Sequence, residues 1–132
     1  MRILFADDEP HNIAALLEKA KAEGHEVHLC FSATEAVHFV STTKVDCLVI
    51  DIMMDPGPDF PNTKPHQAGL AAIDRILELN HHQKIVCISV VSDQRIIKSL
   101  KRKRVLFLRK GETPYATAWQ TIVSKMTGIY KV

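Results

Sequence analysis

Short runs of apolar residues alternate along this chain with segments in which apolar residues recur at helical spacing. A short, largely apolar run between turn signals is typical of a strand that is buried on both faces. Five such strands are predicted: Arg2–Ala6, Val27–Cys30, Val45–Ile50, Ile85–Ile88 and Val105–Leu108.

A helical pattern follows each of these strands. Pro10 suits the first turn of the first helix, and Ser32 with Glu35 forms a capping box at the start of the second. Thr113 is expected to cap the last helix, with Pro114 at its first helical position. Apolar residues at helical spacing mark the core-facing sides of the five helices: Ile13, Leu16, Leu17 and Ala20; Ala36, Val37 and Val40; Leu70, Ile73, Ile76 and Leu77; Ile96, Ile97 and Leu100; Trp119, Ile122, Val123 and Met126.

Five strand–helix units in succession predict a doubly wound α/β fold. Parallel strands need crossover helices, and right-handed crossovers place these helices on both faces of the sheet, giving three layers. We expect one domain over residues 1–132, because this length falls within the usual range for a single core. Residues 55–65 contain four prolines and are predicted to be an insertion without regular structure.

Composition narrows the function classes. Seventeen Lys and Arg residues face fifteen Asp and Glu residues, so the net charge of +2 does not indicate nucleic-acid binding. The basic segment 98–104 lacks the aromatic residues that would stack on bases, and we expect no direct nucleic-acid partner. No apolar run approaches the roughly 20 residues of a membrane span, so no membrane partner is expected. Three cysteines in apolar runs predict buried free thiols in the reducing cytoplasm.

The residues that can do chemistry stand where the predicted strands end. Asp7 and Asp8 follow the first strand, Asp51 the third, Ser89 the fourth and Lys110 the fifth. Ligands of such sheets bind at the carboxyl ends of the strands, so these side chains are expected to converge. Three crowded carboxylates repel one another and favour a divalent cation, and oxygen ligands suit Mg²⁺. A carboxylate beside Mg²⁺ can attack phosphorus, while ammonium and hydroxyl groups hold the phosphoryl oxygens.

In this order and at these strand ends, the five residues resemble the receiver domain of two-component response regulators of the chemotaxis-regulator type. The resemblance covers the chain from Arg2 to about Met126. It implies a flavodoxin-like (βα)5 sandwich whose parallel sheet has the strand order 2-1-3-4-5. It also implies a protein of a His-Asp phosphorelay, a signal-transduction phosphoprotein that responds to phosphorylation.

The resemblance assigns a role to each matching residue. Asp51 would be the phosphoacceptor, and Lys110 would contact the phosphoryl group. Ser89 would be the switch hydroxyl and Phe107 the switch aromatic residue. Mg²⁺ would be held by four groups: Asp7, Asp8, Asp51 and the backbone carbonyl of Met53.

The resemblance also implies partners. The phosphoryl donor would be a sensor histidine kinase or a phosphotransfer protein. A downstream protein would bind the face formed by the fourth helix, the fifth strand and the fifth helix. We do not expect an enzyme, beyond autophosphorylation from small phosphodonors and autodephosphorylation.

Three departures from the family pattern keep other interpretations open. Val90 stands where the family has a small residue, Gly111 stands where it has proline, and the loop after Asp51 is longer. These departures favour a receiver-like binding module that works without phosphorylation. A metal-dependent phosphohydrolase ranks last, because Asp7-Asp8 lacks the Asp-x-Asp spacing of haloacid-dehalogenase-like enzymes.

Two of the candidate switch residues also have simpler structural interpretations. Ser89 could cap the following helix. Phe107 could be an ordinary core residue.

Overall fold

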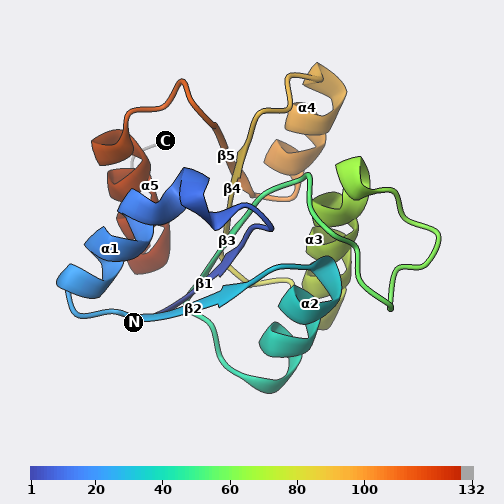
Figure 1. Ribbon diagram of the computed structural model, residues 1–132, viewed down its shortest axis with the longest axis horizontal. Coiled ribbons are helices and arrows are strands. Elements are labelled where there is room, and N and C mark those ends of the chain that lie inside the picture. The colour runs from blue at the N-terminus through green and yellow to red at the C-terminus, as the bar shows by residue number, and fades with distance from the viewer. Residues whose placement is uncertain (129–132) are drawn as a thin grey trace.

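The structure is a computed structural model that describes residues 1–128. Residues 129–132, which the predicted domain 1–132 includes, lie outside the described residues. One parallel sheet has the strand order β2-β1-β3-β4-β5, so the implied order is confirmed (Figure 1). Its strands are β1 (Arg2–Ala6), β2 (Glu26–Cys30), β3 (Cys47–Ile50), β4 (Ile85–Ser89) and β5 (Leu106–Arg109).

Helices lie on both faces of this sheet and complete the three layers. Helices α1 and α5 lie on one side, and α2, α3 and α4 lie on the other (Figure 1). Within residues 1–128, no helix is long and apolar enough to cross a membrane. The helices are α1 (Ala14–Ala22), α2 (Ala33–Thr42), α3 (Ala68–Leu79), α4 (Gln94–Arg102) and α5 (Tyr115–Thr127), with 3₁₀ turns η1 (Pro10–Ile13) and η2 (Pro65–Gln67).

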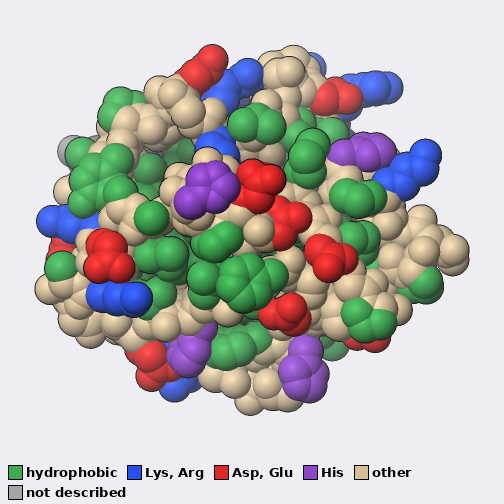
Figure 2. Space-filling model, in the orientation of Figure 1, with side chains coloured by type: hydrophobic (Ala, Val, Ile, Leu, Met, Phe, Trp, Pro, Cys, Tyr) green, Lys and Arg blue, Asp and Glu red, His purple; other side chains and the backbone are tan. Residues whose placement is uncertain are grey.

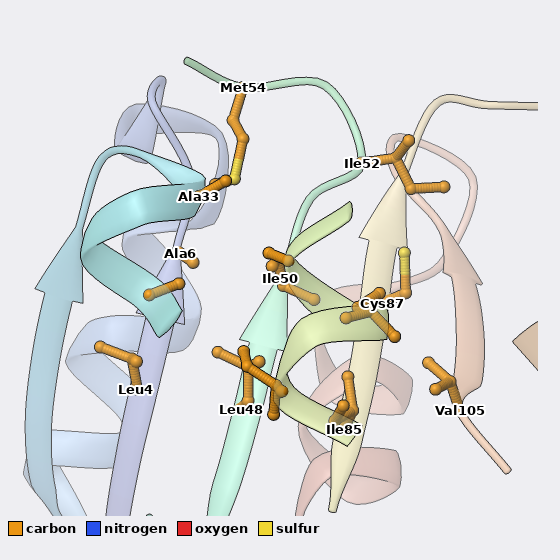
Figure 3. Packing of buried hydrophobic residues seen from close by; sticks show 14 of the residues in the cluster. Leu4, Ala6, Ala33, Leu48, Ile50, Ile52, Met54, Ile85, Cys87 and Val105 are labelled. Carbon is orange, nitrogen blue, oxygen red and sulfur yellow. The ribbon is translucent and has the colours of Figure 1, made fainter. Parts of the chain in front are cut away.

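The alternation of side chains along each strand divides the core into two halves. In β1, Leu4 and Ala6 pack under α2 and α3, while Ile3 and Phe5 pack under α1 and α5. Figure 3 shows the first half, where β1, β3 and β4 contribute alternate residues to one apolar layer. The three cysteines, all free and buried as predicted, belong to these layers: Cys30, Cys47 and Cys87.

One prediction and one alternative interpretation of helix starts are wrong. Helix α5 begins at Tyr115, because Pro114 has an extended backbone (φ −57°, ψ 142°) and occupies the capping position without a side-chain cap. Thr113 instead donates its backbone N–H to the carbonyl of Arg109, 3.0 Å away, within the turn after β5. Ser89 does not cap α4, because Asp93 is the capping residue and accepts a hydrogen bond from the Arg95 N–H.

The predicted N-cap of α2 at Ser32 is confirmed, and the capping box around it is modified. The Ser32 hydroxyl accepts a hydrogen bond from the Glu35 N–H at 3.1 Å, as expected, while the Glu35 carboxylate accepts the N–H of Phe31, one residue before the N-cap, rather than that of Ser32. Residues 55–65 form turns, apart from an isolated bridge between Ser32 and Asp55 and the start of η2 at Pro65. The predicted lack of regular structure is therefore nearly complete, and the bridge joins this loop to α2.

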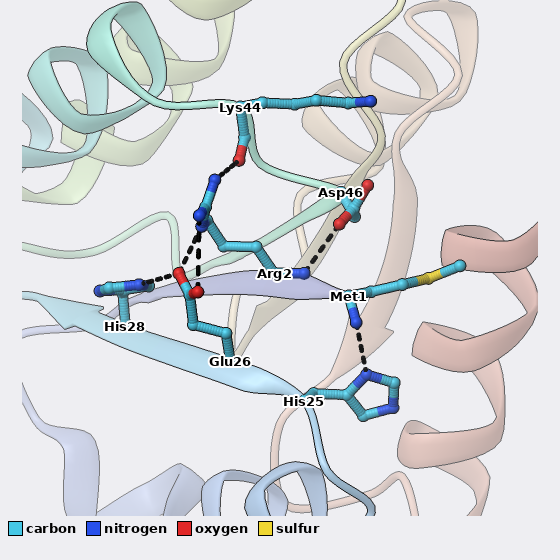
Figure 4. A network of polar contacts seen from close by, with 7 residues as sticks. All are labelled: Met1, Arg2, His25, Glu26, His28, Lys44 and Asp46. Carbon is cyan, nitrogen blue, oxygen red and sulfur yellow. Dashed lines mark hydrogen bonds and ion pairs between the residues drawn. The ribbon is translucent and has the colours of Figure 1, made fainter.

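At their starting ends, β1 and β2 are linked by an exposed ionic network (Figure 4). The guanidinium of Arg2 pairs with the carboxylate of Glu26, which also contacts His28 at 2.6 Å. Arg2 further donates to the carbonyl of Lys44, and its backbone N–H donates to Asp46. This network fastens the sheet at the end opposite to the strand-end carboxylates.

Candidate phosphoryl-acceptor site

Two carboxylates and one ammonium group meet at the carboxyl edge of the sheet. Asp7 directly follows β1 and Asp51 directly follows β3, and these two strands are hydrogen-bonded neighbours. Lys110 directly follows β5, and its backbone N–H donates to the carbonyl of Ser89 on β4. The Lys110 Nζ lies 2.9 Å from Asp7 Oδ2 and 2.7 Å from Asp51 Oδ2. The expected convergence of these three residues is therefore observed.

These charges are largely removed from water. The exposed fractions of Asp7 and Asp51 are 2% and 8%. Each carboxylate gives one oxygen to Lys110 and accepts a backbone N–H on the other: Asp7 from Glu9 at 2.8 Å, and Asp51 from Met53 at 3.3 Å. In both cases the carboxylate binds the backbone N–H two residues further along the chain, and this local turn holds the side chain in one orientation.

The ammonium group of Lys110 stays charged in this environment. Burial acts to lower the pKa of Lys110, but hydrogen bonds and charge from Asp51 and Asp7 outweigh it and raise the pKa above its ordinary value. The group as a whole still carries one more negative than positive charge. An additional cation is therefore electrostatically favoured beside it.

Asp8 lies at the exposed side of this group. Loss of solvent raises the pKa of Asp8, and the negative charge of Asp7 is the next largest cause. The carboxylates of Glu9 and Asp51 act in the same direction, while the backbone of Asp55 opposes them. Figure 2 shows acidic side chains across the middle of this face, over the loops that follow β1 and β3 in Figure 1.

A cavity of about 150 Å³ opens onto Asp51. Val90, with an exposed fraction of 59%, and Met53, with 47%, place apolar side chains at this opening. Asn12, one turn along the chain from Asp8, is a lining residue that the sequence interpretation missed. The complete lining is Asp8, Glu9, Asn12, Asp51, Met53, Val90 and Lys110.

The donor set of this cavity suits Mg²⁺ without forming a finished metal cage. Within residues 1–128, no three His, Cys, Asp or Glu side chains are arranged to hold a metal ion as they stand. Lys110 already bridges two of the three expected carboxylates. Mg²⁺ needs only one or two carboxylates, because it keeps several water ligands. The acidic side chains offer only oxygen ligands, which suit such an ion. Loss of solvent and neighbouring negative charge raise the pKa of Asp8, and the same negative charge favours a bound cation.

The two predicted switch residues lie below this surface. Ser89 is fully buried, and its hydroxyl accepts a long hydrogen bond (3.4 Å) from the Val91 N–H rather than lining the cavity. Phe107 is half-buried and packs against the apolar layer under α2, α3 and α4. This contact agrees with the interpretation of Phe107 as a core residue.

A glycine that the sequence interpretation passed over lets α3 approach the acceptor. A Cβ at Gly69 would lie 2.1 Å from the backbone oxygen of Asp51 and 2.6 Å from the Cα of Ile52. The Gly69 N–H donates to the Ile52 carbonyl at 2.8 Å. Any side chain at position 69 would therefore push α3 away from the segment that carries Asp51.

The fold and this site define a receiver-like α/β protein, and comparison with known proteins agrees. Residues 3–116 match the response regulator receiver domain family, and the chain belongs to this family. No curated protein matches the sequence.

Solved structures share the fold at low sequence identity. A CheY-like receiver domain protein from Methanospirillum hungatei JF-1 is 15% identical, with a TM-score of 0.79, over 97% of this chain and 94% of that one. A receiver domain of a Francisella response regulator is 19% identical, with a TM-score of 0.76, over 98% of both chains. A LuxR-family response regulator from Aurantimonas is 20% identical, with a TM-score of 0.77, over 96% of this chain and 85% of that one.

Proposed function

We propose that this receiver domain is phosphorylated on Asp51 in a His-Asp phosphorelay. A carboxylate oxygen of Asp51 attacks the phosphorus of a phosphohistidine on a sensor kinase or phosphotransfer protein. The P–N bond breaks as the P–O bond forms, and the electron pair returns to the imidazole nitrogen, which takes a proton. The observation that carries this proposal is the buried Asp51 carboxylate, paired with Lys110 and open to a cavity.

Several groups around Asp51 would stabilise the negative charge of the phosphoryl group. When bound, Mg²⁺ would offset charge on the transferring phosphoryl oxygens. Asp7, Asp8, Asp51 and the carbonyl of Met53 would hold it. The Lys110 ammonium, already on Asp51, would stabilise the negative charge that the phosphoryl group adds. The Met53 N–H keeps the other Asp51 oxygen oriented.

Phosphorylation would then alter a protein-binding surface. Ser89 and Phe107 would transmit the change, and the face of α4, β5 and α5 would meet the downstream partner. Catalysis would be limited to autophosphorylation and autodephosphorylation. Three buried free thiols fit the reducing cytoplasm, where we expect the protein to act.

Intact-protein mass after incubation with Mg²⁺ and acetyl phosphate tests the acceptor. We expect one added phosphoryl group, absent when Mg²⁺ is chelated and absent in Asp51→Asn. An adduct of equal size in Asp51→Asn would show that another residue is the acceptor.

A second candidate is a receiver-like module that binds its partner without phosphorylation. Val90 at the cavity opening favours it, because this side chain narrows the approach to Asp51. The same mass measurement separates the two, since this module would show no adduct. If Val90→Ala then acquires an adduct, access to Asp51 is the reason.

A further inference from the structure

The proline-rich segment after β3 is a closed loop rather than a loose insertion. The Met54 N–H donates to the carbonyl of Pro65 at 3.1 Å, which joins the two ends of the loop. Inside it, the Gly57 N–H donates to the side chain of Asp55, and the Phe60 ring packs against the core under α2 and α3. Compact loops with joined ends are frequently functional.

This loop is fastened to the first turn of α2. The carbonyls of Asp55 and Pro56 accept the backbone N–H groups of Ala33 and Thr34, at 2.9 and 3.0 Å. The first N–H groups of a helix lack partners within the helix, so the loop supplies them. Figure 1 shows the loop on the side of the molecule where α2 and α3 lie.

The Thr34 hydroxyl makes this attachment specific. It donates to the carbonyl of Pro56 at 3.1 Å and accepts the N–H of Asp59 at 3.0 Å. Gly57 has a positive φ of +78°, and a Cβ there would lie 2.5 Å from the Thr34 hydroxyl oxygen. One hydroxyl therefore holds two points of the loop in a notch that admits only glycine between them.

The fastened end of the loop reaches the candidate site. The loop continues directly from Met53, which lines the cavity beside Asp51. Asp55, whose carbonyl is held by α2, also interacts through its backbone with the carboxylate of Asp8. Movement of the loop away from α2 would displace both the Met53 and the Asp55 backbone from these acids.

We propose that Thr34 is a positioning residue for the cation site: by fastening the loop to α2, it holds the backbone of Met53–Asp55 beside Asp8 and Asp51. This inference rests on the proposed function, because it concerns the Mg²⁺ that phosphoryl transfer requires. A released loop would have to be ordered again when the ion binds. The affinity for Mg²⁺ would fall accordingly.

Magnesium affinity by calorimetry, with MgCl₂ alone, tests this proposal on three variants. Thr34→Val keeps the shape but removes the hydroxyl and both of its hydrogen bonds to the loop, and we expect about fivefold weaker Mg²⁺ binding. Thr34→Ser keeps the hydroxyl and should stay within about twofold of wild type. Thr42→Val is the matched control, because the Thr42 hydroxyl contacts only carbonyls of its own helix.

Hydrogen exchange gives a readout that does not depend on the ion. The Asp59 amide should lose protection in Thr34→Val and retain it in Thr34→Ser and Thr42→Val. Gly57→Ala tests the same attachment from the loop side, away from the core. It should weaken Mg²⁺ binding to a similar extent.

Failure of this inference can be told from failure of the proposed function. If wild type binds Mg²⁺ and the Thr34→Val and Gly57→Ala variants bind it equally well, the positioning role of Thr34 is overturned. If wild type itself does not bind Mg²⁺, the proposed function is overturned and this inference with it.

Discussion

Two ionic clusters lie at opposite ends of the same sheet and differ in burial. Arg2 and Glu26 join the starting ends of β1 and β2, with side-chain exposures of 35% and 52%. Lys110 joins Asp7 and Asp51 at the carboxyl end, where the side-chain exposures are 13%, 3% and 9%. Both clusters link strands, but the second is much less exposed to water.

This difference in burial indicates that the exposed cluster joins two strands, whereas the buried cluster is a candidate binding site. Exposed ion pairs contribute little to stability, because solvent screens them and long side chains lose entropy. Removing water from a buried cluster of unequal charge costs free energy. Apolar side chains in place of such a cluster often give a protein of equal stability. The Lys110 cluster is therefore better explained by what it can bind than by the strands it joins.

The largest expected loss of stability follows from removing the ammonium group of Lys110. Lys110→Met leaves the carboxylates of Asp7 and Asp51 facing each other with no cation between them, and we expect a loss of about 3 kcal/mol in unfolding free energy. Urea unfolding at neutral pH measures it, with exposed Lys98→Met as control. Adding Asp51→Asn to Lys110→Met should restore part of the loss. A cost equal to that of Lys98→Met would contradict the distinction between the clusters.

Binding of Mg²⁺ should raise the unfolding free energy of the protein by a comparable amount. At about one hundred times its dissociation constant, a ligand of the folded state adds about 2.7 kcal/mol. The melting temperature of wild type should rise with MgCl₂, and that of Asp8→Ala should rise much less. Glu26→Gln should respond as wild type does. An equal response of Asp8→Ala would place the ion elsewhere.

Asp51→Asn should change stability by less than about 1 kcal/mol in either direction. It leaves Asp7 and Lys110 as a balanced pair, and the single Asn oxygen can accept from either the Met53 N–H or Lys110. Urea unfolding beside wild type measures this. A large loss would mean that the second negative charge is part of the folding core, not of a site.

The smallest effect belongs to the exposed cluster and depends on pH. The hydrogen bond from Arg2, aided by the one from His28, lowers the pKa of Glu26 from 4.5 to about 2. A lowered pKa stabilises the folded state above pH 4.5, and this contribution is lost as the pH falls toward 2. Glu26→Gln should therefore be slightly less stable than wild type at pH 7 and equal to it near pH 2. Unfolding midpoints across this range test the sign.

The strand-end rule explains which parts of the site could be predicted. Asp7, Asp51 and Lys110 follow apolar runs, and parallel strands bring their carboxyl ends to one edge whatever the details of the loops. Helix starts at Tyr115 and Gln94 were missed, because several residues before each could cap and only backbone angles decide.

Contacts between distant segments were beyond the sequence. The capping-box pattern identified Ser32 correctly as the N-cap of α2. However, no residue near Thr34 in the sequence indicates that its hydroxyl binds a loop residue 25 positions away. Gly69 likewise looks like an ordinary helix residue until α3 is packed against Asp51. Such features depend on where two segments meet, which periodicity does not encode.

The three buried cysteines have a practical consequence. Burial raises the pKa of Cys30 and Cys47 to about 12 and raises that of Cys87 as well, so thiolate is scarce. Toward a maleimide the folded protein should behave as if it had no cysteine. A single dye can thus be attached through Asp59→Cys, at an exposed position of the loop, while slow labelling of the native thiols would report the rate of global opening.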